Sequence, residues 1–351
     1  MSILKVDTLQ HRDGTEYILS ERNKLINGDF SVAQRGTSIT SATDITNNDT
    51  NHTLDRWQLF SDGNDIVDVT QETTTVPTNG LYAIALDVET ANKKFGIAQK
   101  IEQKNCVDLI GNEVTLSFKA KVSSTTNLDN VKCAIIAWDG TADTLTDDMI
   151  SAWGSEGTDP TLATNYTYEN TPANLNLTTS YATYTTTATI DTSGAKNVVV
   201  FIWSDVTTTS AGEFLYITDV QLEKGPSNSI FERKSFGEQY SACQRYFISI
   251  GGDDEYQQIA LGEVNASTNA RVGFAAPCHL FKVPAITVNA ASNFTLNSSG
   301  TGKVASNVTN HRSSKDFVFM DVTMSSSTLF NPARLHANNS TSARLFVDAE
   351  I

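Results

Sequence analysis

Long hydrophobic runs are missing from this sequence of 351 residues, and so are clusters of lysine or arginine. A membrane helix needs about 18 or more apolar residues in a row, and a secretory signal needs a charged start before an apolar core. We therefore expect neither. The formal charge is −15, from 40 acidic and 25 basic residues. Because phosphate-backbone binding needs clustered positive charge, we expect no nucleic-acid partner. The negative electrostatic field of the chain disfavours binding of strongly anionic glycans and favours neutral sugars or a protein surface as partners.

Cysteine is scarce, and familiar catalytic motifs are missing. The four cysteines, Cys106, Cys133, Cys243 and Cys278, stand singly without CxxC spacing, so we expect buried thiols rather than a disulfide framework. The sequence has no Gly-x-Ser-x-Gly elbow, Walker loop, His-Glu-x-x-His motif or dinucleotide fingerprint. We therefore expect no enzyme. A hydrolase nevertheless needs only two facing carboxylates, which folding could bring together.

Strand-forming residues dominate what is present. Thr, Ser, Val and Ile are abundant, which favours a mainly β fold. Residues 114–122 alternate between apolar and polar, as in a strand with one face in a core and one in water. Residues 198–203 form a continuous apolar run, which is typical of a strand covered on both faces. Further strands are predicted at 55–60, 81–88, 96–101, 131–137, 181–190 and 214–222. Together they predict a jelly-roll β-sandwich over residues 24–225.

A short helix is predicted to separate this sandwich from a second β domain. Ser235 stands three residues before Glu238, the spacing of a capping box, so a helix should run from residue 236 to about 246. Strand patterns at 256–264, 270–275, 285–290, 315–324 and 344–351 then predict a smaller antiparallel domain over residues 248–351. The helix has a narrow apolar seam that needs a partner, formed by Phe236, Tyr240, Cys243 and Phe247. The partner is either another copy of the chain or the open end of its own sandwich.

Several short blocks resemble tail-fibre, or receptor-binding, proteins of tailed phages. They are MSILKVDTLQ, LINGDFSVAQRGTS followed by DRWQLF, LYITDVQLEKG, FERKSFGEQY and ACQRYF, and the resemblance covers most of residues 1–250. It implies that residues 1–23 attach to other virion proteins and that residues 24–225 are the jelly roll. Residues 226–247 would then be a connector and helix on the axis of a homotrimer, with a distal β domain after it.

The resemblance implies a virion protein, made in the host cytoplasm, that attaches to a host-surface glycan or protein. Attachment would be multivalent, through several shallow sites on one trimer. Two alternatives remain open. The first is a virion adaptor or capsid-surface fibre without receptor contact, and the second is a glycan depolymerase.

Two sets of residues are candidate sites. The polar segment 139–172 is long for a connector, and such loops are usually functional or disordered. Aromatic rings stack on pyranose faces, so the candidates for carbohydrate binding are Trp138, Trp153, Tyr166 and Tyr168.

The second set concerns a possible structural calcium, since no cofactor is certain. The pairing of residues 27–30 with 216–219 is similar to jelly-roll carbohydrate-binding modules, in which the first and last strands supply oxygen ligands to calcium. That similarity makes Asp29 and Asp219 candidate ligands, within the six or more oxygens that calcium needs. The alternative is that Asp219 meets Arg56 or solvent.

Overall fold

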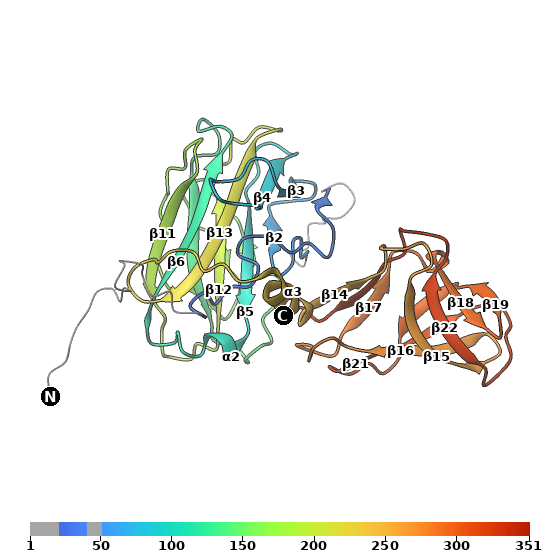
Figure 1. The fold of residues 1–351 in the computed structure, drawn as a ribbon. Helices are drawn as coiled ribbons and strands as arrows, with labels where there is room; N and C mark the ends of the chain where they lie inside the picture. The colour runs from blue at the N-terminus through green and yellow to red at the C-terminus, as the bar shows by residue number, and fades with distance from the viewer. Residues whose placement is uncertain (1–20, 41–50) are drawn as a thin grey trace, which may run out of the picture.

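Figure 1 shows the fold in a computed structural model, which describes residues 21–40 and 51–351. The predicted mainly β architecture is confirmed, with a jelly-roll β-sandwich, a short helix and a smaller antiparallel β unit in that order (Figure 1). Among the described residues, the helices are α2 (Gln103–Cys106), α3 (Phe236–Gln244) and one 3-10 turn, η1 (Ala291–Asn293). Neither α-helix of this part is long and apolar enough to cross a membrane. Residues 1–20 of the predicted attachment segment 1–23 lie outside the described residues.

One layer of the sandwich is a six-stranded antiparallel sheet. Its order is β1 (Ser38–Ile39), β3 (Val67–Glu72), β4 (Ala83–Val88), β13 (Phe214–Lys224), β6 (Glu113–Val122) and β11 (Ala182–Thr189). The alternation predicted for β6 is confirmed from Phe118 onward, where Phe118 lies in the core while Lys119 and Lys121 are partly exposed on the outer face. Thr115 and Ser117, on the same outer face, are buried, so that face is polar and accessible only at the Lys119–Lys121 end of the strand.

The other layer is a five-stranded sheet with both faces buried. Its order is β10 (Tyr166–Tyr168), β7 (Val131–Trp138), β12 (Asn197–Ser204), β5 (Phe95–Ile101) and β2 (Gln58–Ser61). Every residue of β12 is buried, as its continuous apolar run predicted. The sandwich core covers one face. The segment 139–172, with its β8 (Ile150–Ala152) and β9 (Thr161–Leu162) hairpin, covers the other.

Helix α3 begins as predicted and ends earlier. The capping box is present: Ser235 Oγ accepts from the Glu238 N–H at 3.4 Å, and Glu238 Oε2 accepts from the Ser235 N–H at 2.8 Å. The helix stops at Gln244 rather than near residue 246, because the chain turns directly into strand β14 (Phe247–Ile250). All four cysteines are free. Three are buried as expected, and Cys278 is only half-buried.

The C-terminal unit contains two antiparallel sheets. The smaller has the order β14, β23 (Leu345–Asp348) and β17 (Ala285–Val288). The larger has the order β19 (Thr301–Val304), β18 (Phe294–Ser298), β22 (Pro332–Ala337), β15 (Gln258–Ala266), β16 (Asn269–Ala275), β21 (Phe317–Thr323) and β20 (Asn307–Asn310). Strands β15, β16, β17, β21 and β23 correspond to the predicted ones. Strands β18 and β19 form a hairpin whose tight turn lies between Ser298 and Thr301.

A buried ionic contact joins the end of the chain to the sandwich. Arg56 donates to the carboxylate of Glu350, and Arg35 lies 3.2 Å from the other oxygen of that carboxylate. Burial alone would raise the pKa of Glu350, but the charges around it, including Arg56 and Arg35, outweigh burial and hold that pKa at about 2. The Arg56 guanidinium also lies 3.7 Å from the ring centre of Tyr246. Glu350 is therefore the counter-ion that makes burial of Arg56 tolerable.

Replacing Glu350 by Gln should destabilise the full chain by about 3 kcal/mol, because Arg56 stays buried without a carboxylate. A urea titration of the purified chain measures this. The matched control is Asp348→Asn, since Asp348 is 3.6 Å from Arg35 and its side chain is 44% exposed. The control should stay within about 0.5 kcal/mol of the parent. Equal stability of Glu350→Gln and the control would contradict the assigned role.

Candidate functional site

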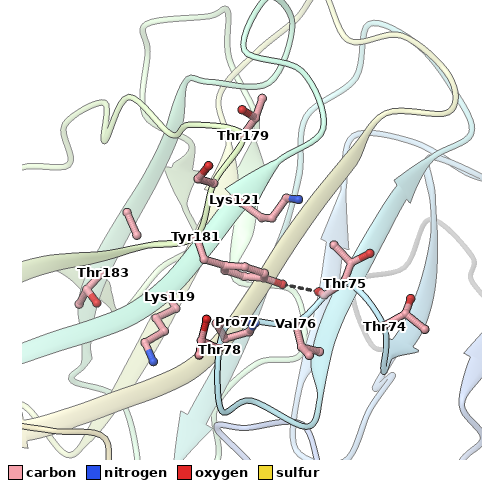
Figure 2. Close-up of a pocket in the computed structure, with 12 residues that line it drawn as sticks. Thr74, Thr75, Val76, Pro77, Thr78, Lys119, Lys121, Thr179, Tyr181 and Thr183 are labelled. Carbon is pink, nitrogen blue, oxygen red and sulfur yellow. Dashed lines mark hydrogen bonds between the residues drawn. The ribbon is translucent and has the colours of Figure 1, made fainter.

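A groove crosses the outer face of the six-stranded sheet. Two adjoining pockets, of about 740 and 620 Å3, share Thr78, Lys119 and Thr183. We call them together the outer groove. Its walls are the β3–β4 loop, the turn before β11 and the segment after β13; its residues are 74–79, 117–119, 121, 179–183, 219, 228–231 and 233. Figure 2 shows the half of the groove that holds Tyr181 and both lysines.

A hydrogen bond across this half holds the β3–β4 loop over the sheet. Tyr181 Oη donates to the carbonyl oxygen of Thr75 at 2.8 Å, the dashed line in Figure 2. Burial raises the pKa of Tyr181, so its hydroxyl stays protonated and remains a donor at neutral pH. Pro77, in the same loop, is buried. The loop is therefore a fixed wall of the groove rather than a loose flap.

Lysine and aromatic side chains alternate across the sheet at this point. The strand register sets Tyr216 of β13 directly opposite Lys121 of β6. The Lys121 ammonium lies 5.4 Å from the Tyr216 ring centre and 5.9 Å from that of Tyr181. Phe214 stacks on Tyr216 with ring centres 5.6 Å apart. Such cation–π contacts hold an ammonium group in place without neutralising its charge.

A carboxylate with two cations occupies the other half of the groove. Asp219 accepts from Lys119 Nζ at 2.9 Å and from Arg233 Nη2 at 3.1 Å. Its φ of 52° falls at a β-bulge, where the register of β13 on β6 shifts between Thr218 and Gln221. The bulge turns Asp219 toward the groove, where sequence periodicity alone would not have placed it.

Residues 27–30, which the sequence similarity pairs with residues 216–219, do pack against this bulge of β13. Val220 N donates to the carbonyl oxygen of Gly28 at 2.8 Å, and a Cβ at Gly28 would stand 2.1 Å from the Val220 oxygen. Only glycine fits that approach. Asp29 and Asp219 both face Arg233, at 4.0 and 3.1 Å.

The residues around Asp29 and Asp219 do not fit a calcium ion. Their carboxylates face Arg233 and Lys119, whereas calcium needs six or more oxygen ligands. Within the part of the chain that the structure describes, no group of three or more His, Cys, Asp or Glu side chains could hold a metal. The predicted alternative partner of Asp219 is also wrong, because Arg56 pairs with Glu350.

The aromatic residues predicted to bind carbohydrate lie elsewhere and are mostly buried. Trp138, Trp153 and Tyr166 are only 3%, 9% and 6% exposed, in the cluster that covers the five-stranded sheet. Tyr168 is half-buried and donates its hydroxyl to the Pro160 carbonyl at 2.8 Å. Trp138 and Tyr166 belong to strands β7 and β10 of that sheet and Trp153 packs over it, so these three rings are not open to a sugar, while Tyr168 is partly accessible.

The predicted helical seam is divided between surface and interior. Cys243 is buried, and Phe247 belongs to β14, where it packs on Phe346 with ring centres 5.8 Å apart. Phe236 is 62% exposed and stacks on the half-buried Tyr240 at 5.7 Å. The inner side of the helix packs on its own sandwich, where Gln239 Oε1 accepts from the Asn27 N–H at 3.2 Å. The two aromatic residues stay at the surface.

Removing calcium should leave the thermal stability of the chain unchanged. Arg233 pairs with both Asp29 and Asp219, and Lys119 pairs with Asp219, so the described residues around these carboxylates offer no calcium shell. Thermal unfolding in excess EDTA and in millimolar calcium should give the same midpoint. A bound ion at a hundred times its dissociation constant would stabilise the fold by about 2.7 kcal/mol, and a midpoint shift of that size would contradict this assignment.

Comparison with known proteins gives low-identity structural neighbours. No protein-family model matches the chain, and no curated protein matches it. One structural neighbour is the enzymatically active domain of tailspike protein 4 from bacteriophage CBA120, with 15% identity and a TM-score of 0.32 over 53% of this chain and 22% of that one. Another is the CBM22-1 xylan-binding domain of Paenibacillus barcinonensis Xyn10C, with 13% identity and a TM-score of 0.29 over 54% and 94%.

A third neighbour is a CBM4 structure, with 16% identity and a TM-score of 0.30 over 57% of this chain and 98% of that one. This chain therefore spans about a fifth of the tailspike domain and nearly all of each module. Likenesses at this level carry no argument about what this chain binds. The structural neighbours thus include carbohydrate-binding modules and a phage tailspike domain, all at low identity.

Proposed function

We propose that this protein is a virion fibre component of a phage, which attaches to the host surface by binding a glycan in the outer groove. The observation that carries the proposal is the groove itself, an open polar channel on a rigid sheet. Hydroxyl groups of threonine and serine line it, beside the ring of Tyr181. Hydroxyls match the hydrogen bonds of a sugar, and a tyrosine ring matches its apolar face. The resemblance of the sequence blocks to phage tail fibres supports the virion assignment.

Binding without hydrolysis is the chemistry that the groove supports. Among the described residues that line it, Asp219 is the only acidic one, and its carboxylate is bound to Lys119 and Arg233. A glycosidase needs two facing carboxylates, one of them free to give or take a proton. We therefore propose that the chain is not an enzyme. A virion adaptor without receptor contact remains the competing function, and it predicts that glycans are ignored.

The aromatic pair of α3, exposed Phe236 and half-buried Tyr240, is suited to contact with another copy of the chain, and the tail-fibre resemblance makes that assembly a trimer within this proposal. Phe236 and Tyr240 border a pocket of about 260 Å3 that Ala33, Gly251 and Arg344 also line. An exposed aromatic pair beside a pocket is suited to contact with a second chain. Three copies of a shallow groove would raise avidity without strong binding at any one of them.

Blocking the groove should abolish glycan binding. Thr183 is exposed on β11 and lines both pockets, so Thr183→Trp should fill the channel and lower binding at least tenfold. The matched control is Thr187→Trp, on the same face of the same strand but about 13 Å along it. The measurement uses fluorescently labelled chain on a panel of bacterial surface polysaccharides. Equal loss in both variants would remove the groove as the site, and no binding by the parent would favour the adaptor.

The trimer is tested by the mass of the full chain in solution. Light scattering should give three times the monomer mass for the parent and the monomer mass for the Phe236→Glu/Tyr240→Glu variant, because charges replace the aromatic contact. Ser241→Glu, on another side of the same helix, is the control and should stay trimeric. A monomeric parent would leave α3 as a cover for its own sandwich only.

A further inference from the structure

The charge of the outer groove is opposite to that of the protein. The whole chain carries −15, yet the described residues that line the groove include Lys119, Lys121 and Arg233 against the single carboxylate of Asp219. The lining therefore has a net charge of +2. The pocket that contains Tyr181 has two lysines and no acidic side chain among its described lining residues. This local excess of positive charge on an acidic protein can attract a negatively charged group of a ligand.

Lys121 is the cation available to a ligand. Lys119 and Arg233 share Asp219, whereas none of the ion pairs found among the described residues uses Lys121. Its ammonium contacts the rings of Tyr216 and Tyr181 instead, at 5.4 and 5.9 Å from their centres. Both rings leave the positive charge uncompensated.

Glu72, the acidic residue at the start of the β3–β4 loop, is hydrogen-bonded within that loop. Glu72 stands where β3 ends, and its carboxylate accepts from the Thr75 N–H at 2.8 Å and from the Thr74 hydroxyl at 2.6 Å. It therefore shapes the loop, and none of the ion pairs among the described residues joins it to Lys121. Hydroxyls of Thr78, Thr179 and Ser180 surround the same pocket and can bond a sugar ring.

We propose that the outer groove selects an acidic sugar residue, placing its carboxylate or sulfate group at the Lys121 ammonium and its ring along the hydroxyl-lined wall. The inference rests on the glycan-binding function proposed above. The charge of −15 repels a dense polyanion, so the ligand is a glycan in which acidic residues are spaced among neutral ones. The preference for neutral sugars expected from the composition applies to the overall field and not to this groove.

The test compares one ligand with and without its acidic group. A surface polysaccharide that binds the full chain is converted chemically, in one sample by reducing its carboxyl groups to alcohols and in another by removing its sulfate groups. One of the two treatments should lower the affinity at least tenfold, which also tells carboxylate from sulfate. If neither treatment weakens binding, the inference is wrong while glycan binding stands. If no polysaccharide of the panel binds, the proposed function fails and the inference fails with it.

Variants at Lys121 then assign the effect to that residue. Lys121→Gln should bind the native polysaccharide about as weakly as the treated one, so the affinity of this variant should be the same for both ligands. Lys121→Arg keeps the charge and should keep the preference. Lys303→Gln removes the same charge from β19 and should behave as the parent. A preference that survives in a folded Lys121→Gln would overturn the role of Lys121, with folding checked by thermal unfolding.

Discussion

The five-stranded sheet has two apolar faces, and the protein has to cover both. The sandwich core covers one, and the cluster of Trp138, Trp153, Phe201 and Trp203 lies on the other. A buried cation keeps that cover in place. Lys94 Nζ donates to the carbonyls of Ser155 and Thr158 at 2.8 and 3.1 Å and is paired with Asp205. Because the buried Lys94 ammonium has hydrogen-bond partners and a counter-ion, it can anchor the polar segment 139–172 over the apolar face of the five-stranded sheet.

This requirement decides which surface is left for binding. Trp153 of segment 139–172 covers the five-stranded sheet, and Tyr166 is buried in the edge strand β10 of that sheet, so neither ring is open to a ligand. In the six-stranded sheet β4 and β13 are also almost fully buried, whereas β6 and β11 keep Lys119, Lys121 and Thr183 at least partly exposed on the outer face. Its outer face therefore keeps polar side chains, and the β3–β4 loop converts that face into a groove. The groove thus lies where β6 and β11 keep polar side chains on the outer face of the six-stranded sheet.

Much of the fold could be predicted from local patterns, whereas the groove could not. The alternation of β6, the apolar run of β12 and the Ser235–Glu238 cap each depend on residues close in sequence. The groove depends on register between strands, since Lys121 meets Tyr216 only once β6 and β13 are paired. The β-bulge that turns Asp219 outward has no local signature either.

Two other errors have the same physical origin. Phe247 fitted a helical spacing, but pairing with β23 makes it a strand residue. The apolar run of β12 did indicate a cover on both faces. Nothing local showed that segment 139–172 was the cover, because its contacts depend on Lys94 and Asp205, which are distant in sequence.

The buried contact between Arg56 and Glu350 also bears on how the groove is presented. Residues 294 positions apart form it, and Ile351 belongs to the same apolar cluster as Trp203 and Tyr246. The end of the chain thus packs against the sandwich, as Figure 1 shows beside α3. The polar contact restricts this packing to one geometry, because a displaced Glu350 would leave Arg56 buried and unpaired. A groove on a firmly joined body loses little freedom when it binds, and this lowers the entropic cost of attachment through several weak sites.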